Sequence, residues 1–311
     1  MIPRTLIAGL CAVALFAPLA SAGDAELTKI KVAFLPAEPA VLVTYAKHRA
    51  MFTKQGIDAE MVPRNDPQLI LGALLSGDVQ FSGTHAGAAL LFKVRGIPVK
   101  VVASGALFDP KHPTAALVAG KGKSITRPRD LVGKTILIDS PTTIAHIGVL
   151  KWLKRGGVSP DDVTIKFVLF ADMLPQLANG QVDAAFLPEP FLTQVRQQGL
   201  KVIAYPFNAV CSKTCLTTFW VSGPGVNENL RARFRNAVQK AAIWANDPKN
   251  DAASAKIFAR YVPGIDPKVM AKMERTRFGT RLRLPLVQPW IDVYAEFGYI
   301  PAGFKATDLV K

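Results

Sequence analysis

Short apolar runs alternate along the chain with stretches whose apolar residues recur at helical spacing, a pattern typical of layered α/β folds. The first set of runs predicts strands over residues 28–35, 58–63, 79–82 and 99–104, with helices over residues 39–54, 67–75 and 85–95. A second set predicts strands over residues 135–138, 163–169, 182–186 and 201–205, with helices over residues 144–154, 173–178 and 190–198. Both sets therefore indicate strands alternating with covering helices.

The two sets resemble each other in residues as well as in order. A shift of 103 positions places Leu71, Leu74, Gly77, Val79, Gly96 and Val99 on Leu174, Leu177, Gly180, Val182, Gly199 and Val202. Each set thus closes a short helix, turns at a glycine and enters a strand. This predicts two homologous α/β lobes in tandem.

The chain changes character after the second set. A returning strand is predicted over residues 217–222, and helices follow over residues 227–246, 251–261, 266–276 and 284–297. We expect the chain to cross between lobes near residues 107–113 and 207–214. The predicted first lobe is residues 23–107 with 215–311, and the predicted second lobe is residues 108–214.

The N-terminus has the pattern of a secretory signal peptide. Arg4 precedes an apolar run over residues 6–19, and Ala20-Ser21-Ala22 supplies a small-x-small cleavage site. The alternative is a membrane anchor, but the run is shorter than the ~20 residues that a spanning helix needs. We therefore predict cleavage after Ala22 and a periplasmic mature protein.

Composition and charge narrow the function. The chain has 311 residues, of which 50% are hydrophobic and 20% charged, so disorder is excluded. A net charge of +15 could suit nucleic acid, but export and the lack of aromatic–basic interleaving argue against such a partner. No complete phosphate loop, dinucleotide fingerprint or hydrolase motif is present, and the histidines lack metal-binding spacing. We predict a binding protein, with no cofactor or metal, rather than an enzyme.

Only two cysteines remain after the predicted cleavage, Cys211 and Cys215. Outside the cytosol such a pair favours a disulfide. The bond requires Cα atoms within roughly 7 Å, whereas four extended steps would span roughly 13 Å. Residues 212–214 must then form a turn. A metal site is the alternative, but no histidine lies nearby to complete a ligand set.

Ligands of open α/β sheets bind outside the carboxyl ends of strands, where loops lead into helices. Four loops of the chain hold that position, and we expect them to meet around a cleft. Their candidate ligand-binding residues are Pro36, Ala37 and Glu38, then Thr84 and His85, then Ser140, Thr142 and Thr143, and finally Glu189.

The hydroxyl residues at 140–143 carry the most information. They follow a strand and precede a helix, so hydroxyls and free backbone N–H groups meet at a positive helix end, which suits a small anion. Ordinary N-capping is the alternative, and at least one of them should cap the helix. His85 occupies the equivalent place in the first lobe and could donate to an anionic oxygen.

Glu189 raises the question of ligand charge. A carboxylate repels an anion, so Glu189 indicates either a ligand with an amine or ring N–H, or a structural role at its own helix start. Glu38 raises the same question. The densest basic cluster, at Arg275, Arg277, Arg281 and Arg283, could clamp a carboxylate or sulfonate, although a solvated surface is the simpler interpretation.

Six stretches resemble periplasmic solute-binding proteins of nitrate-, sulfonate- and taurine-type ABC importers, a family that also includes binders of thiamine pyrimidine precursors. They are residues 46–60 (AKHRAMFTKQGIDAE), 74–81 (LLSGDVQF), 95–103 (RGIPVKVVA), 130–138 (DLVGKTILI), 177–191 (LANGQVDAAFLPEPF) and 288–309 (QPWIDVYAEFGYIPAGFKATDL).

The resemblance implies a two-lobed type II periplasmic-binding fold whose hinge is crossed twice. It also implies delivery of a small molecule to an inner-membrane permease without catalysis. We expect the protein to be a monomer. Sulfonate- and taurine-like members commonly carry Asp beside Pro in the last loop, where this chain has Glu189. The apolar loop at Pro36 suits an organic tail better than nitrate. A small organic anion or zwitterion is therefore expected, with a pyrimidine-type heterocycle or an exported enzyme on the same fold as alternatives.

Overall fold

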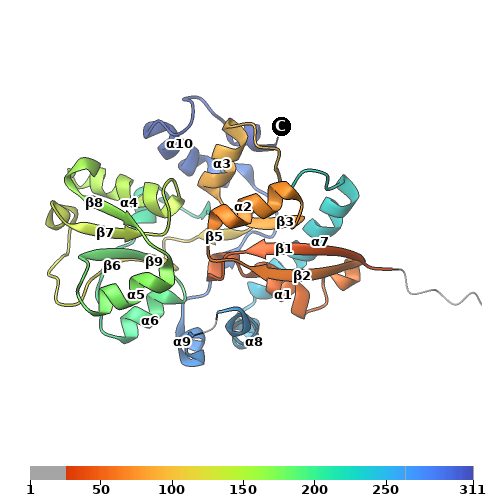
Figure 1. Cartoon of the computed structure of the whole chain (residues 1–311), viewed down its shortest axis with the longest axis horizontal. Coiled ribbons are helices and arrows are strands. Elements are labelled where there is room, and N and C mark those ends of the chain that lie inside the picture. The colour runs from red at the N-terminus through yellow and green to blue at the C-terminus, as the bar shows by residue number, and fades with distance from the viewer. Residues whose placement is uncertain (1–25, 263, 311) are drawn as a thin grey trace, which may run out of the picture.

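The computed structural model describes residues 26–262 and 264–310, and the predicted signal peptide lies outside this part of the chain. Two five-stranded sheets lie side by side (Figure 1). The first has the strand order β2-β1-β3-β12-β4, in which β1 is parallel to β2 and β3, and β12 is antiparallel to β3 and β4. Its strands are β1 (Thr28–Phe34), β2 (Ile57–Pro63), β3 (Phe81–His85), β4 (Lys100–Ser104) and β12 (Thr218–Ser222).

The second sheet repeats this topology with the order β8-β7-β9-β6-β10. Here β7 is parallel to β8 and β9, and β6 is antiparallel to β9 and β10. Its strands are β6 (Ala115–Ala119), β7 (Thr135–Ile138), β8 (Thr164–Phe167), β9 (Ala184–Pro188) and β10 (Val202–Ala204). Both sheets thus consist of parallel strands in the same order plus one antiparallel strand, as the internal repeat predicts.

A small third sheet connects the two large ones. The chain leaves the first sheet through β5 (Ala106–Phe108) and returns through β11 (Cys215–Leu216), and these two strands pair antiparallel with each other. Strand β13 (Arg277–Phe278) adds to the other edge of β5. The two crossings therefore run side by side, which is the arrangement that a hinge requires.

The disulfide at the second crossing is confirmed. Cys211 and Cys215 are bonded, with their Cα atoms 6.1 Å apart, and both residues are buried. The intervening residues bend as the spacing requires. The bridge fixes the short segment between the 3-10 helix Pro206–Ala209 and β11.

Helices cover both sheets (Figure 1). Asp66, Thr143 and Asn227 cap the N-termini of α2, α4 and α7 with their side chains. None of the helices among the described residues is long and apolar enough to cross a membrane. The helices are α1 (Leu42–His48), α2 (Pro67–Ser76), α3 (Ala86–Val94), α4 (Ile144–Arg155), α5 (Phe170–Ala178), α6 (Phe191–Gln197), α7 (Glu228–Ala245), α8 (Asp251–Phe258), α9 (Pro267–Lys272) and α10 (Gln288–Glu296).

Two predicted helices are wrong in extent. The segment 39–54 contains only α1 as an α-helix, because the chain turns through Ala50, whose φ is 54°. The segment 266–276 ends as a helix at Lys272, because Thr276 donates its N–H to the buried carboxylate of Glu38 and the next residues pair with β5. Sequence analysis also missed β5 and β6, which lie at and just after the first crossing.

Candidate functional site

A cavity of about 240 Å³ lies between the carboxyl ends of strands from both large sheets. The first sheet contributes the end of β3 and the loop after β1, and the second contributes the end of β9 and the loop after β7. This is the place at which open α/β sheets bind ligands. The predicted residues that line it are Ala37, Thr84, His85, Ser140, Thr142 and Thr143.

The β7–α4 loop presents its polar groups to the cavity. Thr143 is the N-cap of α4: its Oγ1 accepts from the N–H of His146 at 3.2 Å and donates to Oδ1 of Asp139 at 3.0 Å. Thr142 has a φ of 62°, in the left-handed region that β-branched residues rarely adopt. Its N–H donates to Nδ1 of His146 at 3.2 Å. The predicted capping role thus belongs to Thr143, and Ser140 and Thr142 remain available to a ligand.

His85 occupies the corresponding place in the first sheet. It is the last residue of β3 and the N-cap of α3, where its Nδ1 accepts from the N–H of Ala88 at 3.0 Å. Burial lowers the pKa of the imidazole to about 4, so the ring is neutral at pH 7. Because Nδ1 is an acceptor, the proton lies on Nε2. His85, which lines the cavity, therefore carries one N–H donor at Nε2.

Sequence reasoning missed Asp139, which lines the cavity directly after β7. Burial raises the pKa of its carboxyl group to about 6, although hydrogen bonds from Thr143 and Ser140 act in the opposite direction. Its place at the end of a predicted strand was a usable signal, because that is where the ligand loops begin.

Glu189, a predicted contact, is not among the lining residues that the structure describes. Its carboxylate is buried and accepts from the N–H and Oγ1 of Thr193 at 3.0 and 2.9 Å. Burial raises the pKa of this carboxyl to about 7. Of the two roles considered for Glu189, the geometry favours the one at the start of its own helix, α6.

Glu38 and Pro36 are also absent from the described cavity lining. Glu38 is fully buried and forms an ion pair with Arg275 at 3.2 Å. Its backbone N–H donates to the carbonyl of Glu189 at 3.1 Å, which joins the loops after β1 and β9. These two glutamates therefore connect the two sheets beside the cavity.

The arginine cluster does not reach the cavity. Arg275 is held by Glu38, Tyr45 and Ser254. Arg277, Arg281 and Arg283 line a separate pocket beside β13. Among the described lining residues, Arg95 is the one arginine or lysine, and it is exposed. The site therefore holds little positive side-chain charge, and no group of His, Cys, Asp and Glu in the described part of the chain could hold a metal ion.

Aromatic side chains supply much of the remaining lining. Sequence analysis did not assign them to the site, because phenylalanines in strands and amphipathic helices are expected in the core. They are Phe92, Phe108, Phe170, Phe186 and Phe207. The cavity thus combines an apolar wall with a few polar groups, as small-molecule sites usually do.

The fold is the two-lobed type II periplasmic-binding fold. The chain superposes on the alkanesulfonate-binding protein of Xanthomonas axonopodis pv. citri with a TM-score of 0.73 and 19% identity, over 92% of this chain and 99% of that one. The family model described as NMT1/THI5 like matches residues 40–251, more than half of the chain, so the chain belongs to this family. The resemblance seen in the sequence is thereby confirmed.

Two curated proteins are similar in sequence. An ABC transporter periplasmic binding protein of Brachyspira hyodysenteriae is 28% identical over 213 residues, which is 64% of this chain and 60% of that protein. The taurine-binding periplasmic protein of Escherichia coli is 26% identical over 181 residues, which is 57% of this chain and 53% of that protein. The alignment therefore spans less than two thirds of either relative.

Proposed function

We propose that this protein is the periplasmic substrate-binding component of an ABC importer. It captures a small organic anion or zwitterion in the cavity between the sheets and delivers it to an inner-membrane permease. The observation that carries this proposal is the cavity itself, which is lined by strand ends of both sheets and by the N-terminal residues of α3 and α4. The names of the two similar curated proteins support it.

The mechanism follows from the two crossings. Because β5 and β11 run side by side between the large sheets, bending there changes the distance between the two walls of the cavity. A ligand that contacts both walls favours the closed form by its differential affinity for that form. Thr84 and His85 line the cavity from the first sheet, and Ser140, Thr142 and the N-terminal residues of α4 line it from the second. The proposal includes no chemical step, and it takes the protein to act as a monomer.

A pyrimidine-type heterocycle is the second candidate ligand. The observation that favours it is the aromatic lining, because flat rings stack well on phenylalanine. The NMT1/THI5-like family match agrees with either ligand class.

A thermal-shift panel on the purified protein tests the proposal. The panel contains taurine, propanesulfonate, aromatic sulfonates, nitrate, bicarbonate, hydroxymethylpyrimidines and small carboxylates. A ligand at 100 times its dissociation constant stabilises the folded protein by ~2.7 kcal/mol, which raises the melting temperature by several degrees. A hit that Ser140→Ala with Thr142→Ala abolishes would support the cavity as the site. A hit that this variant and a cavity-wall variant such as Phe186→Ala both leave unchanged would contradict it.

A further inference from the structure

The charge of the cavity does not match a simple anion. Asp139 is the only Asp or Glu among the cavity-lining residues that the structure describes. No cation forms an ion pair with Asp139 within residues 26–262 and 264–310. An unpaired carboxylate here would repel the sulfonate or carboxylate of a plain organic anion.

The hydrogen bonds of Asp139 leave it room for a ligand. Oδ1 accepts from Oγ1 of Thr143 at 3.0 Å, and backbone N–H groups of the loop, including that of Ser140, also interact with the carboxyl group. A carboxylate has about four acceptor positions, so Asp139 can still accept a hydrogen bond from a ligand. The nearby hydroxyl of Tyr294 donates to the carbonyl of Thr142. Asp139 is half-buried as a residue and lines the cavity.

Capping of α4 does not account for this placement. Thr143 already caps α4 with its own hydroxyl. Glu189 shows what a structural carboxylate looks like in this fold: it is fully buried, and both of its oxygens accept from Thr193. Asp139 differs because it lines the cavity, whereas Glu189 is not among the described lining residues.

We propose that Asp139 is a specificity-determining residue that accepts a hydrogen bond from an ammonium or N–H group of the ligand. The ligand then carries a nitrogen donor as well as an acceptor or anionic group. Neutral His85 and Thr84 line the cavity from the opposite sheet and can meet the latter. This inference rests on the proposed function and narrows its ligand to a zwitterion or an amino-substituted heterocycle.

Two pairs of probes of equal shape test the inference by calorimetry. Taurine and propanesulfonate differ by an ammonium in place of a methyl group, and 4-aminopyrimidine and 4-methylpyrimidine differ by an amino group in place of a methyl group. We expect the wild-type protein to prefer the nitrogen-bearing member of at least one pair by about tenfold or more. Asp139→Asn should remove this preference by weakening the nitrogen-bearing probe, and it should strengthen propanesulfonate.

Asp161→Asn is the matched control, because the substitution removes the same charge. Asp161 is exposed, lies outside the cavity and belongs to the same sheet and its connections. The melting temperature of each variant without probe shows that it folds. Asparagine keeps an oxygen that can accept from Thr143, so Asp139→Asn should fold normally.

The outcomes separate the inference from the proposed function. Equal binding of both members of each pair, or a preference that survives Asp139→Asn, overturns the inference and leaves the proposed function standing. Failure of all four probes to bind the wild-type protein overturns both the inference and the proposed ligand class.

Discussion

The hydroxyl of Tyr294 donates a hydrogen bond of 2.6 Å to the backbone carbonyl of Thr142. Tyr294 lies on α10 near the end of the chain, whereas Thr142 lines the cavity in the β7–α4 loop. The bond holds a residue whose φ of 62° is unfavourable for threonine. A helix remote in sequence thus positions a loop of the candidate site.

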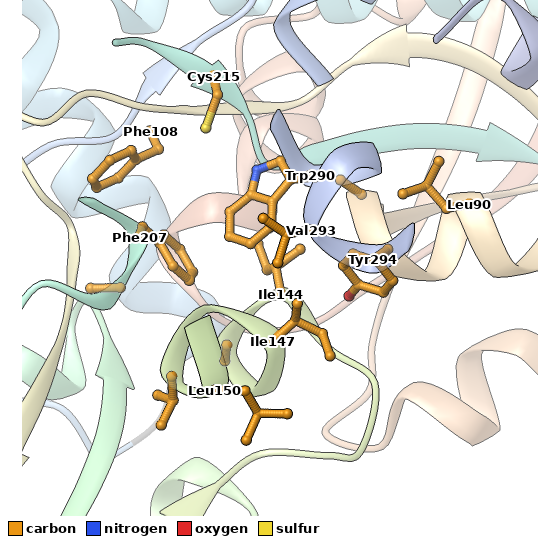
Figure 2. Packing of buried hydrophobic residues seen from close by; sticks show 14 of the residues in the cluster. Leu90, Phe108, Ile144, Ile147, Leu150, Phe207, Cys215, Trp290, Val293 and Tyr294 are labelled. Carbon is orange, nitrogen blue, oxygen red and sulfur yellow. The ribbon is translucent and has the colours of Figure 1, made fainter. Parts of the chain in front are cut away.

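The packing of α10 explains how this contact arises. This helix packs against both α3 and α4, so it contacts covering helices of both large sheets (Figure 1). Its Trp290 meets Phe207 edge to face with ring centroids 5.0 Å apart, and Tyr294 belongs to the same buried cluster as Leu90 (Figure 2). Glu296 forms ion pairs with Lys151 and Lys154 of α4. Any motion of one sheet relative to the other must therefore be accommodated at α10.

The Tyr294–Thr142 bond predicts the effect of Tyr294→Phe. The variant keeps the ring but leaves the Thr142 carbonyl without its donor, so the free energy of unfolding should fall by about 1 kcal/mol. Ligand affinity should fall as well, because the loop loses a restraint. Urea denaturation and calorimetry measure the two effects. Tyr205→Phe is the control, because Tyr205 is bonded to Arg196 away from the cavity; equal affinity losses in both variants would contradict the positioning role.

Gly87, at the start of α3, lies against the Tyr294 ring and so tests the Tyr294–Thr142 contact from the first lobe. A Cβ atom at Gly87 would lie 1.6 Å from the hydroxyl oxygen of Tyr294 and 2.2 Å from its Cζ, so Gly87→Ala must displace Tyr294. We expect a loss of about 1–3 kcal/mol in stability, together with weaker ligand binding.

Gly72→Ala is the matched control for Gly87→Ala. Gly72 lies exposed inside α2, and nothing lies within 4 Å of a Cβ atom there. This variant should gain up to about 1 kcal/mol, because alanine favours the helix. A Gly87→Ala protein as stable as Gly72→Ala would show that α10 yields without cost. Thermal denaturation of both variants decides the matter.

Periodicity predicted the strands of the two repeated sets well, since β7 has the predicted bounds and β1 and β2 differ from theirs by one residue. Strand β6 was missed because Ala115–Ala119 is mainly alanine, which has little strand preference and no bulk to mark a buried run. Its sequence position, just after a crossing, also gave no expectation of a central strand.

The candidate site was predictable at the level of loops but not of individual carboxylates. In β9, side chains alternate: Phe186 and Pro188 line the cavity, whereas Leu187 belongs to a core cluster on the other face. Glu189 continues this alternation away from the cavity. The same alternation, applied to the sequence, would have predicted that Glu189 points away from the cavity. The place of Asp139 in the cavity lining depends on the shape of the β7–α4 turn, which the alternation of side chains along a strand does not predict.

Removing the hydroxyls of Ser140 and Thr142 in the β7–α4 loop should weaken ligand binding without unfolding the protein. Ser140→Ala with Thr142→Ala removes two hydroxyls that line the cavity but leaves the Thr143 cap intact. Each lost hydrogen bond to a charged ligand should cost roughly 1.5–3 kcal/mol of binding free energy. Calorimetry with the ligand found in the panel measures this loss, and unchanged affinity would show that the two hydroxyls make no ligand contact. Thr143→Ala should instead destabilise the protein by about 1 kcal/mol.

Glu189 predicts how stability depends on pH. Its folded-state pKa, raised to about 7, lies above the ordinary value of 4.5, so the folded protein binds the proton more tightly than the unfolded chain does. This group's contribution is therefore lost as the pH rises from about 4.5 to about 7. Glu189→Gln, which resembles the protonated acid, should be more stable than wild type at pH 8 by on the order of 1–3 kcal/mol.

Urea denaturation at pH 5 and pH 8 checks the prediction for Glu189. The advantage of Glu189→Gln should shrink at pH 5, where the wild-type carboxyl is already protonated. Asp161→Asn, at an exposed aspartate, should show no such pH-dependent advantage. A Glu189→Gln protein that is less stable than wild type at both pH values would show that Thr193 requires the ionised form.

The disulfide predicts a modest effect of reduction. Cys211 and Cys215 close a very short loop, so the chain-entropy contribution is on the order of 2 kcal/mol. The double variant Cys211→Ala with Cys215→Ala should fold and melt several degrees lower. The cavity should be affected too, because the bridge follows the 3-10 helix that carries Phe207, a lining residue. Ligand affinity in the double variant should therefore fall together with its melting temperature. A variant that melts lower and binds as tightly as wild type would show that the aromatic wall is held by Trp290 and its neighbours without help from the bridge.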